Sequence, residues 1–145
     1  KKDQTPKELG QGYVLELKNN FERTGIAFLE YDKVCVVDLD VFPVKDLNNN
    51  ILRAKANYLS QNNSFTKDNF HTPHIDFKVK HKVVLYYVNN SDGDTLFFDK
   101  EGSIINRVNP IKGRCVIFDG DILHASQNPI NWSDRIVINI DLQDE

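Results

Sequence analysis

Two histidines and an aspartate lie within the short segment FHTPHIDF, residues 70–77. His74 and Asp76 are two positions apart, so on a strand both side chains would point to the same face. An imidazole nitrogen and a carboxylate oxygen placed in this way can bind one metal ion. His124, in the later segment DILHAS, is a candidate for a third ligand. These three residues therefore predict a metal site.

Two neutral imidazoles and one carboxylate on one face of an octahedral ion leave the opposite face open, as Fe(II) oxygen chemistry requires. Zinc usually has four ligands and keeps at most one open position, so the triad favours iron. A His-x-Asp tripeptide alone is weak evidence, because it also occurs in polar turns that enter a strand. The other two histidines, His71 and His81, are expected at the surface.

Arg135 begins the last strand-like segment, RIVINIDL. Side chains alternate along a strand, which gives a polar face (Arg135, Val137, Asn139, Asp141) and an apolar face (Ile136, Ile138, Ile140, Leu142). The apolar face is expected to pack against a second layer, and the polar face meets either solvent or a polar cavity. An oxygenase that uses a 2-oxo acid must hold its distal carboxylate, which a guanidinium binds in two-pronged fashion. This favours a cavity lined by Arg135 and Asn139 over a solvated edge arginine.

The elements that must position these residues are mostly short strands. From residue 74 onward, strand-like segments alternate with turn formers, which predicts strands at 74–79, 82–89, 95–99, 103–108, 113–119, 121–126 and 135–142. Many short strands without intervening helices are typical of an antiparallel sandwich, barrel or jelly roll.

The N-terminal third is more mixed. Residues 33–43 read as a strand, residues 51–60 as a strand or a helix, and Thr5 as the N-cap of a helix. We expect one domain, residues 1–145, that is mainly β. Its supporting N-terminal helix or helices would lie in residues 1–50, packed outside a jelly-roll catalytic core formed by residues 51–143.

Composition restricts the partners. The net charge is −3 with acidic and basic residues intermixed, which argues against a nucleic-acid or anionic membrane surface as partner. No apolar run is long enough to span a bilayer. Cys35 and Cys115 lie in separate apolar segments and are expected to be buried free thiols, which fits a cytoplasmic location. The sequence predicts no oligomeric state.

The ordered stretch HIDF…KVVLYYVNNSDGDTLFFD…INRVNPIKGRCVIFDGDILHASQNPINWSDRIVINIDL resembles the 2-oxoglutarate/Fe(II) dioxygenase superfamily, and within it the prolyl-4-hydroxylase-like branch. The resemblance covers roughly residues 51–143. It implies a double-stranded β-helix, iron bound by His74, Asp76 and His124, and 2-oxoglutarate bound by Arg135.

The same resemblance suggests further cosubstrate contacts. The segment LYYVN matches the family's tyrosine-bearing strand, with Leu85 and Tyr87 facing inward; Tyr87 is either a hydroxyl contact or a core residue. GDTLFF matches a glycine-glycine-x-threonine element, in which Leu96 lines the pocket, chiefly by packing. Tyr58 stands roughly where the family often has a tyrosine, but the long polar loop after it, residues 60–70, weakens that match.

The expected function is that of an Fe(II)- and 2-oxoglutarate-dependent dioxygenase that uses O2 to hydroxylate an unactivated C–H bond. Its expected substrate is a prolyl residue in a peptide or protein, or else a small molecule. Two alternatives remain open at this point: a cupin-like metalloenzyme that uses no 2-oxo acid, and a jelly-roll binding module. A buried Arg135 argues against both.

Overall fold

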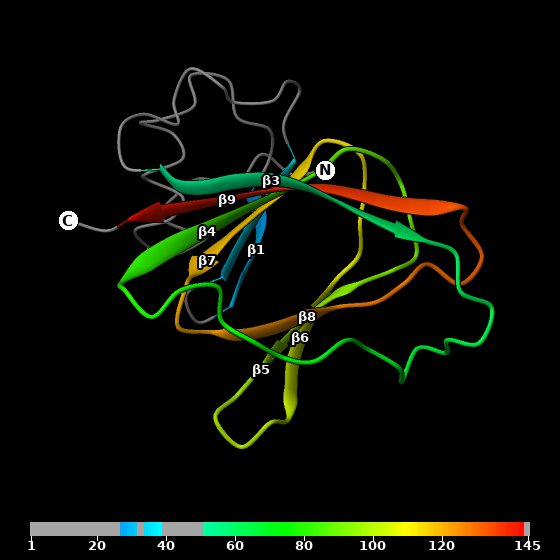
Figure 1. Cartoon of the computed structure of the whole chain (residues 1–145), viewed down its shortest axis with the longest axis horizontal. Helices are drawn as coiled ribbons and strands as arrows, with labels where there is room; N and C mark the ends of the chain where they lie inside the picture. Colours follow the sequence, from blue (N-terminus) through cyan, green and yellow to red (C-terminus); the bar gives the residue numbers. More distant parts are fainter. Residues whose placement is uncertain (1–26, 32–33, 39–50, 144–145) are drawn as a thin grey trace.

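The computed structural model describes residues 27–31, 34–38 and 51–143 (Figure 1). Their strands are β1 (Ala27–Tyr31), β2 (Val34–Asp38), β3 (Ile51–Ser60), β4 (His81–Tyr87), β5 (Thr95–Phe98), β6 (Ile104–Val108), β7 (Arg114–Asp119), β8 (Leu123–Ser126) and β9 (Asp134–Gln143). The expected helix at Thr5 lies outside the described residues. No helix in the described ranges is long and apolar enough to cross a membrane.

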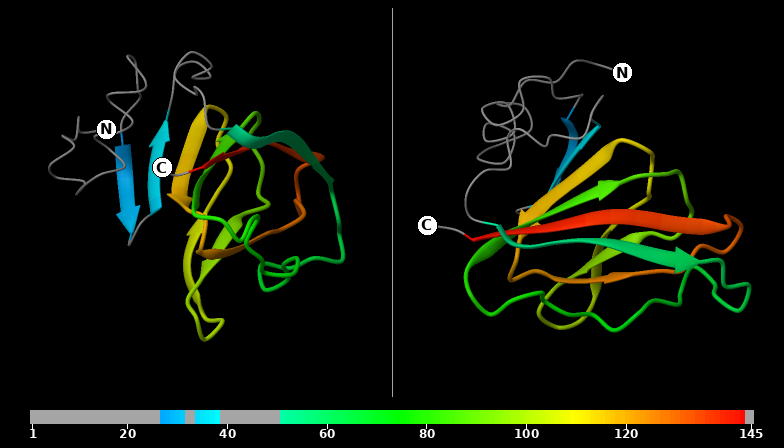
Figure 2. Two further views of the ribbon diagram at one scale, coloured as in Figure 1. Left: turned by 60° about the vertical axis from the view of Figure 1, so that its left-hand side comes forward. Right: turned by 45° about the horizontal axis from the view of Figure 1, so that its top comes forward.

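Two antiparallel sheets form the described part of the protein. The larger has the order β1-β2-β7-β4-β9-β3 and the smaller the order β6-β5-β8. Figures 1 and 2 show the smaller sheet lying across one face of the larger one. The mainly β architecture predicted from the sequence is confirmed, and it is consistent with a jelly roll.

The N-terminal strands belong to the large sheet. β2 pairs with β7 along its whole length, and β1 continues the sheet beyond β2. Val34 and Val36 are fully buried in the same core as the later strands. These strands therefore extend the sheet, whereas the sequence suggested that the N-terminal third packs outside the core. The division at residue 50 stays a prediction.

The core lies between the two sheets. Phe97 of β5 and Phe118 of β7 meet edge to face, with ring centroids 4.9 Å apart, and both are completely buried. β-Branched residues from the large sheet surround them, among them Val83, Val116 and Val137. This packing fixes the spacing of the sheets and thereby the width of the space beside the core.

The segment 74–79 is not a strand, in contrast to the sequence prediction. It forms a single antiparallel bridge, in which the backbone N–H groups of His74 and His124 donate to each other's carbonyl oxygens. β8, which contains His124, is only four residues long and pairs with β5 on its other side. After the bridge the chain turns away, so the predicted same-face geometry of His74 and Asp76 does not arise from strand pleating.

Two further predictions are corrected on the large sheet. His81 was expected at the surface but is 3% exposed, because its ring occupies the space that a side chain at Gly120 would need. On β9 the small sheet lies against the polar face, so Arg135 is buried while Ile136 and Ile138 are only half-buried on the opposite side. The apolar face of β9 therefore does not pack against the second sheet.

The structure also bears on residues 51–60 and on the cysteines. Residues 51–60 form a strand, β3, which pairs with β9. Cys115 is a buried free thiol, as predicted, and the side chain of Cys35 is outside the description.

Candidate metal centre

Three potential metal ligands converge beside the core. The Nε2 atom of His124 lies 3.5 Å from Asp76 Oδ2, and the Nε2 atom of His74 lies 3.8 Å from Asp76 Oδ1. One ligand atom from each residue falls within 4.8 Å of the others. The backbone bridge between His74 and His124 is what brings the two imidazoles together, with ring centroids 4.7 Å apart.

Both imidazoles are held in the tautomer that a metal needs. His74 Nδ1–H donates to the carbonyl of Thr72, and His124 Nδ1–H donates to the carbonyl of Ile122, each at 3.0 Å. A carbonyl oxygen only accepts, so the proton of each neutral ring is on Nδ1 and the lone pair is on Nε2. Such outer hydrogen bonds orient the histidine ligands of metal sites. The donor set therefore fits a divalent metal ion.

Asp76 is fixed by two neighbours. Arg53 Nη2 donates to Oδ1 at 2.7 Å, and Asn139 Nδ2 lies 3.4 Å from Oδ2. Burial alone would raise the pKa of Asp76, but the proximity of His124 and the hydrogen bonds from Arg53 and Asn139 lower it well below its usual range. The group is thus an anionic carboxylate that can act as a metal ligand.

Arg53 also binds a second buried carboxylate. Its Nε donates to Asp141 Oδ2 at 3.0 Å, so one guanidinium bridges Asp76 and Asp141. Burial, followed by the nearby charge of Asp76, raises the pKa of Asp141. Arg53 could not be recognised from the sequence. Residues 51–60 could have been a strand or a helix, and nothing in the sequence indicates that Arg53 would lie next to Asp141 of β9.

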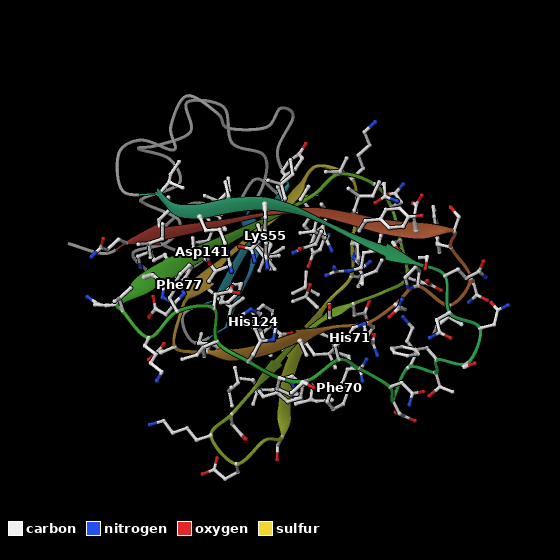
Figure 3. All side chains as sticks on the ribbon, in the orientation of Figure 1. Lys55, Phe70, His71, Phe77, His124 and Asp141 are labelled. Carbon is white, nitrogen blue, oxygen red and sulfur yellow. The ribbon has the colours of Figure 1, made fainter. Side chains whose placement is uncertain are left out.

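A cavity of about 350 Å³ lies between the sheets and is lined by the two histidines of the triad, His74 and His124. In Figure 3 the side chain of His124 lies between β8 and the larger sheet. Among the residues that line it are His74, His124, Leu85, Thr95, Arg135 and Asn139. The structure thus brings Leu85, Arg135 and Asn139 to the cavity lined by His74 and His124, as the sequence suggested. His71, which is exposed as predicted, also lines the cavity.

Arg135 lies at the cavity with 3% of its surface exposed. Its Nε donates to the Gly93 carbonyl and its Nη2 donates to Thr95 Oγ1, both at 2.8 Å. Burial lowers the pKa of Arg135. Within the described residues no carboxylate forms an ion pair with it, so this buried cation still has donors for an anionic ligand.

Of three further residues considered from the sequence, Tyr87 is a core residue, which was one of its two alternatives, and Leu96 is the one whose position differs from the prediction. Tyr87 is fully buried behind Thr95, and its hydroxyl lies 2.6 Å from Thr95 Oγ1. Leu96 points to the other side of β5, where it packs with Phe98 and Ala125, so it does not line the cavity. Tyr58 is 63% exposed.

Thr95 is the cavity residue that the sequence analysis overlooked. It is part of the quoted GDTLFF element, and alternation along β5 places Thr95 and Leu96 on opposite faces. Its hydroxyl links Arg135 to Tyr87. The GDTLFF element could therefore have indicated Thr95 as a cavity residue.

A family model described as the 2OG-Fe(II) oxygenase superfamily matches residues 59–140. A crystal structure of a Pseudomonas putida prolyl-4-hydroxylase is similar with a TM-score of 0.49 and 17% sequence identity, over 63% of this chain and 52% of that chain. The chain thus spans about half the length of that structure. No curated protein sequence matches the chain. The family match contains the three metal candidates and Arg135, and it begins after Arg53.

Proposed function

Because the chain belongs to the 2OG-Fe(II) oxygenase superfamily, we propose that it is an Fe(II)- and 2-oxoglutarate-dependent dioxygenase that hydroxylates an unactivated C–H bond. The observation that supports this most directly is one cavity lined by Arg135 and by His74 and His124, which lie close to Asp76. A metal-binding module or a cupin-like enzyme has no need of a buried guanidinium in the cavity that contains its metal.

In this proposal His74, Asp76 and His124 hold Fe(II). Bound iron and 2-oxoglutarate supply the oxidising chemistry, in which O2 gives one oxygen atom to the substrate C–H bond and one to succinate, with loss of CO2. Arg53 and Asn139 keep the Asp76 carboxylate in a fixed orientation. No side chain of the cavity has to act as a general acid or base.

The other end of the cavity is proposed to bind 2-oxoglutarate. Arg135 offers its remaining N–H groups to the distal carboxylate, in a buried place where a charge-assisted hydrogen bond is strong. Thr95 Oγ1 accepts from Arg135 and can also accept from the Tyr87 hydroxyl, which leaves its own proton for the ligand. Leu85 and Val137 add apolar walls that exclude water. Tyr87 acts through Thr95 here.

We further propose that the two sheets form the double-stranded β-helix expected from the sequence. The resemblance to the prolyl-4-hydroxylase-like branch favours a prolyl residue of a peptide or protein as substrate, with a small molecule as the second choice. Substrate screening should therefore include both classes.

The test measures iron binding and succinate formation with Fe(II), 2-oxoglutarate and a panel of peptides and metabolites. The wild-type protein should retain iron after dialysis and convert 2-oxoglutarate to succinate. Asp76→Ala removes the one anionic ligand, so we expect loss of turnover and of most bound iron with unchanged circular dichroism. Asp68→Ala, at an exposed loop position, is the matched control and should behave as wild type.

Iron occupancy of Asp76→Ala equal to that of wild type would mean that Asp76 is not a ligand. Retention of iron without binding or turnover of 2-oxoglutarate would instead favour a cupin-like enzyme or a binding module.

A further inference from the structure

The inner face of β3 runs along the cavity beside β9, its neighbour in the large sheet. The register pairs Arg53 with Asp141, Lys55 with Asn139, Asn57 with Val137, and Leu59 with Arg135. Directly paired residues of antiparallel strands share a face of the sheet. Lys55 therefore lies on the cavity side, as Asn139 does, and in Figure 3 its side chain lies between β3 and His124.

Lys55 differs from the other cations around this site. Arg53 is engaged by two carboxylates, and Arg135 donates to Gly93 and Thr95. Lys55 is half-buried and lines the cavity, yet among the described residues it has neither a hydrogen-bond nor an ion-pair partner. Partly burying an ammonium group costs hydration free energy, which an internal partner normally offsets.

When the charges around the site are added up, the positive charge of Lys55 is not balanced by a negative group. The negative groups are Asp76, Asp141 and the two carboxylates of 2-oxoglutarate, and they are equal in charge to Arg53, Arg135 and Fe(II) together. Asp94 is not available either, because its carboxylate lies 3.6 Å from Lys67 and 3.8 Å from Arg107. No carboxylate of the site is therefore left to pair with the ammonium of Lys55, which is available to bind a further anion.

The position of Lys55 separates that anion from the cosubstrate. Lys55 and Arg135 are four positions apart in the β3–β9 ladder, which corresponds to about 13 Å along a strand. Lys55 is level with Asn139, whose amide contacts the metal candidate Asp76, while Arg135 lies at the far end. An anion bound by Lys55 thus lies at the metal end of the cavity, where a substrate presents its C–H bond.

We propose that Lys55 binds a carboxylate of the primary substrate, so that the enzyme acts on an acidic substrate. This inference rests on the proposed function. The carboxylate belongs either to a free amino acid or similar small acid, or to the C-terminus of a peptide. A single ammonium suits a carboxylate, whereas phosphate recognition usually adds an arginine fork or a helix N-terminus.

The experiment uses wild-type protein loaded with Mn(II) and N-oxalylglycine, which keeps both carboxylates of 2-oxoglutarate and prevents turnover. Binding is measured by titration calorimetry for matched probe pairs: each proteinogenic L-amino acid against its carboxamide, and Gly-X-Gly peptides with free against amidated C-termini. The first set reports small acids and the second reports peptide termini. We expect at least one acid to bind about tenfold or more tightly than its amide, as for a charge-assisted hydrogen bond.

Lys55→Met should remove this preference for the acid, and Lys55→Arg should keep most of it. The affinity for N-oxalylglycine should change by less than about twofold in both variants, whereas Arg135→Met should weaken it strongly. Lys100→Met, which alters an exposed lysine in the turn after β5, should leave both affinities at the wild-type level.

The inference is wrong if wild type prefers no acid over its amide, or if Lys55→Met keeps the preference. It is also wrong if Lys55→Met weakens N-oxalylglycine as much as Arg135→Met does, since Lys55 would then belong to the cosubstrate. Failure of wild type to bind Mn(II) and N-oxalylglycine at all would refute the proposed function together with the inference.

Discussion

Arg135 is a buried cation whose hydrogen-bond partners are the uncharged Gly93 carbonyl and Thr95 hydroxyl, and its guanidinium lies 5.7 Å from the centroid of the Tyr87 ring. Such an arrangement is costly for the protein alone, because a desolvated charge is normally compensated by an opposite one. A ligand carboxylate would supply the compensation. This makes Arg135 the residue at which the use of a 2-oxo acid can be tested most directly.

Arg135→Met should leave iron bound and strongly raise the apparent dissociation constant of 2-oxoglutarate. Removing one partner of a sheltered charge pair typically costs ~3–5 kcal/mol, which is roughly two to four decades in affinity at about 1.4 kcal/mol per decade. Pyruvate has no distal carboxylate, so it should bind wild type poorly and be nearly indifferent to the substitution. Equal losses for both acids, measured by calorimetry, would mean that Arg135 only supports the sheet.

Arg53 is expected to control the metal ligand Asp76 without touching the metal. Its 2.7 Å ion pair holds Oδ1, and its second carboxylate, Asp141, anchors the guanidinium. Loss of such an outer partner typically lowers metal affinity about 10- to 100-fold. Arg53→Gln should therefore weaken Fe(II) binding by that factor, measured by competition with a chelator.

The affinity of iron-loaded Arg53→Gln for 2-oxoglutarate should change much less than its affinity for iron. Lys80→Gln, at an exposed position just before β4, is the control for loss of a positive charge. Wild-type iron affinity in Arg53→Gln would show that Asp76 is held in place by Asn139 and packing alone.

At the scale of the elements, the carboxylate of Asp92 is one of the groups that hold the connection between β8 and β9 in place. Asp92 accepts hydrogen bonds from the backbone N–H groups of Ile130 and Asn131 at 2.8 and 2.9 Å. Partial burial alone would raise the pKa of Asp92, but these hydrogen bonds lower it below its ordinary value. The connection leads directly into Arg135, so its geometry matters for the cavity.

A lowered pKa in the folded state gives stability that is present above the unfolded pKa of about 3.9 and is lost as the pH falls below it. Asp92→Asn should therefore be less stable than wild type at pH 7, and the difference should narrow as the pH falls through about 4 toward 2. Urea unfolding at several pH values measures this. Asp68→Asn, at an exposed position, should follow the wild-type curve, and a constant difference for Asp92→Asn would rule out the carboxylate as the anchor.

Most strands could be predicted from the sequence, because alternation and turn formers define them locally. The segment 74–79 was an exception: it alternates like a strand, but β8 offers it only one bridge, and partner availability is not a local property. It was harder to predict which side of each strand faces the cavity. Tyr58 and Asn57 differ by one position, and only the pairing of β3 with β9 determines that Asn57 faces the cavity.

The candidate site was partly predictable for the same reason. His74, Asp76, His124 and Arg135 have side chains whose chemistry is specific enough to be recognised without neighbours. Arg53, Lys55 and Thr95 acquire their roles only through residues on other strands. His81 is similar, since its burial depends on the missing side chain of Gly120.

For the whole molecule, the contact between Phe97 and Phe118 joins the two sheets. Phe97→Ala should destabilise the protein by about 3–5 kcal/mol, because it removes a completely buried ring and leaves a cavity. That is a large part of the ~5–15 kcal/mol total of a typical domain. Phe70→Ala, which alters a partly exposed ring against Phe98, should cost clearly less. Similar losses for both, from urea unfolding, would show that the sheets are held together elsewhere.

The residues at the two ends of the cavity lie on strands of different kinds: inner strands at one end and an edge strand of the described sheet, β3, at the other. This difference affects which positions tolerate substitution. Thr95 and Arg135 lie on β5 and β9, each of which has a strand on both sides. In the described part of the chain β3 pairs with β9 alone, so its inward residues Lys55 and Asn57 have fewer neighbours to satisfy. Substitutions at Lys55 and Asn57 should therefore change the wall of the cavity with less disturbance than substitutions at Thr95 or Arg135. Arg53, another inward residue of β3, should be kept because it binds Asp76. Lys55 and Asn57 are thus the natural positions to randomise in directed evolution.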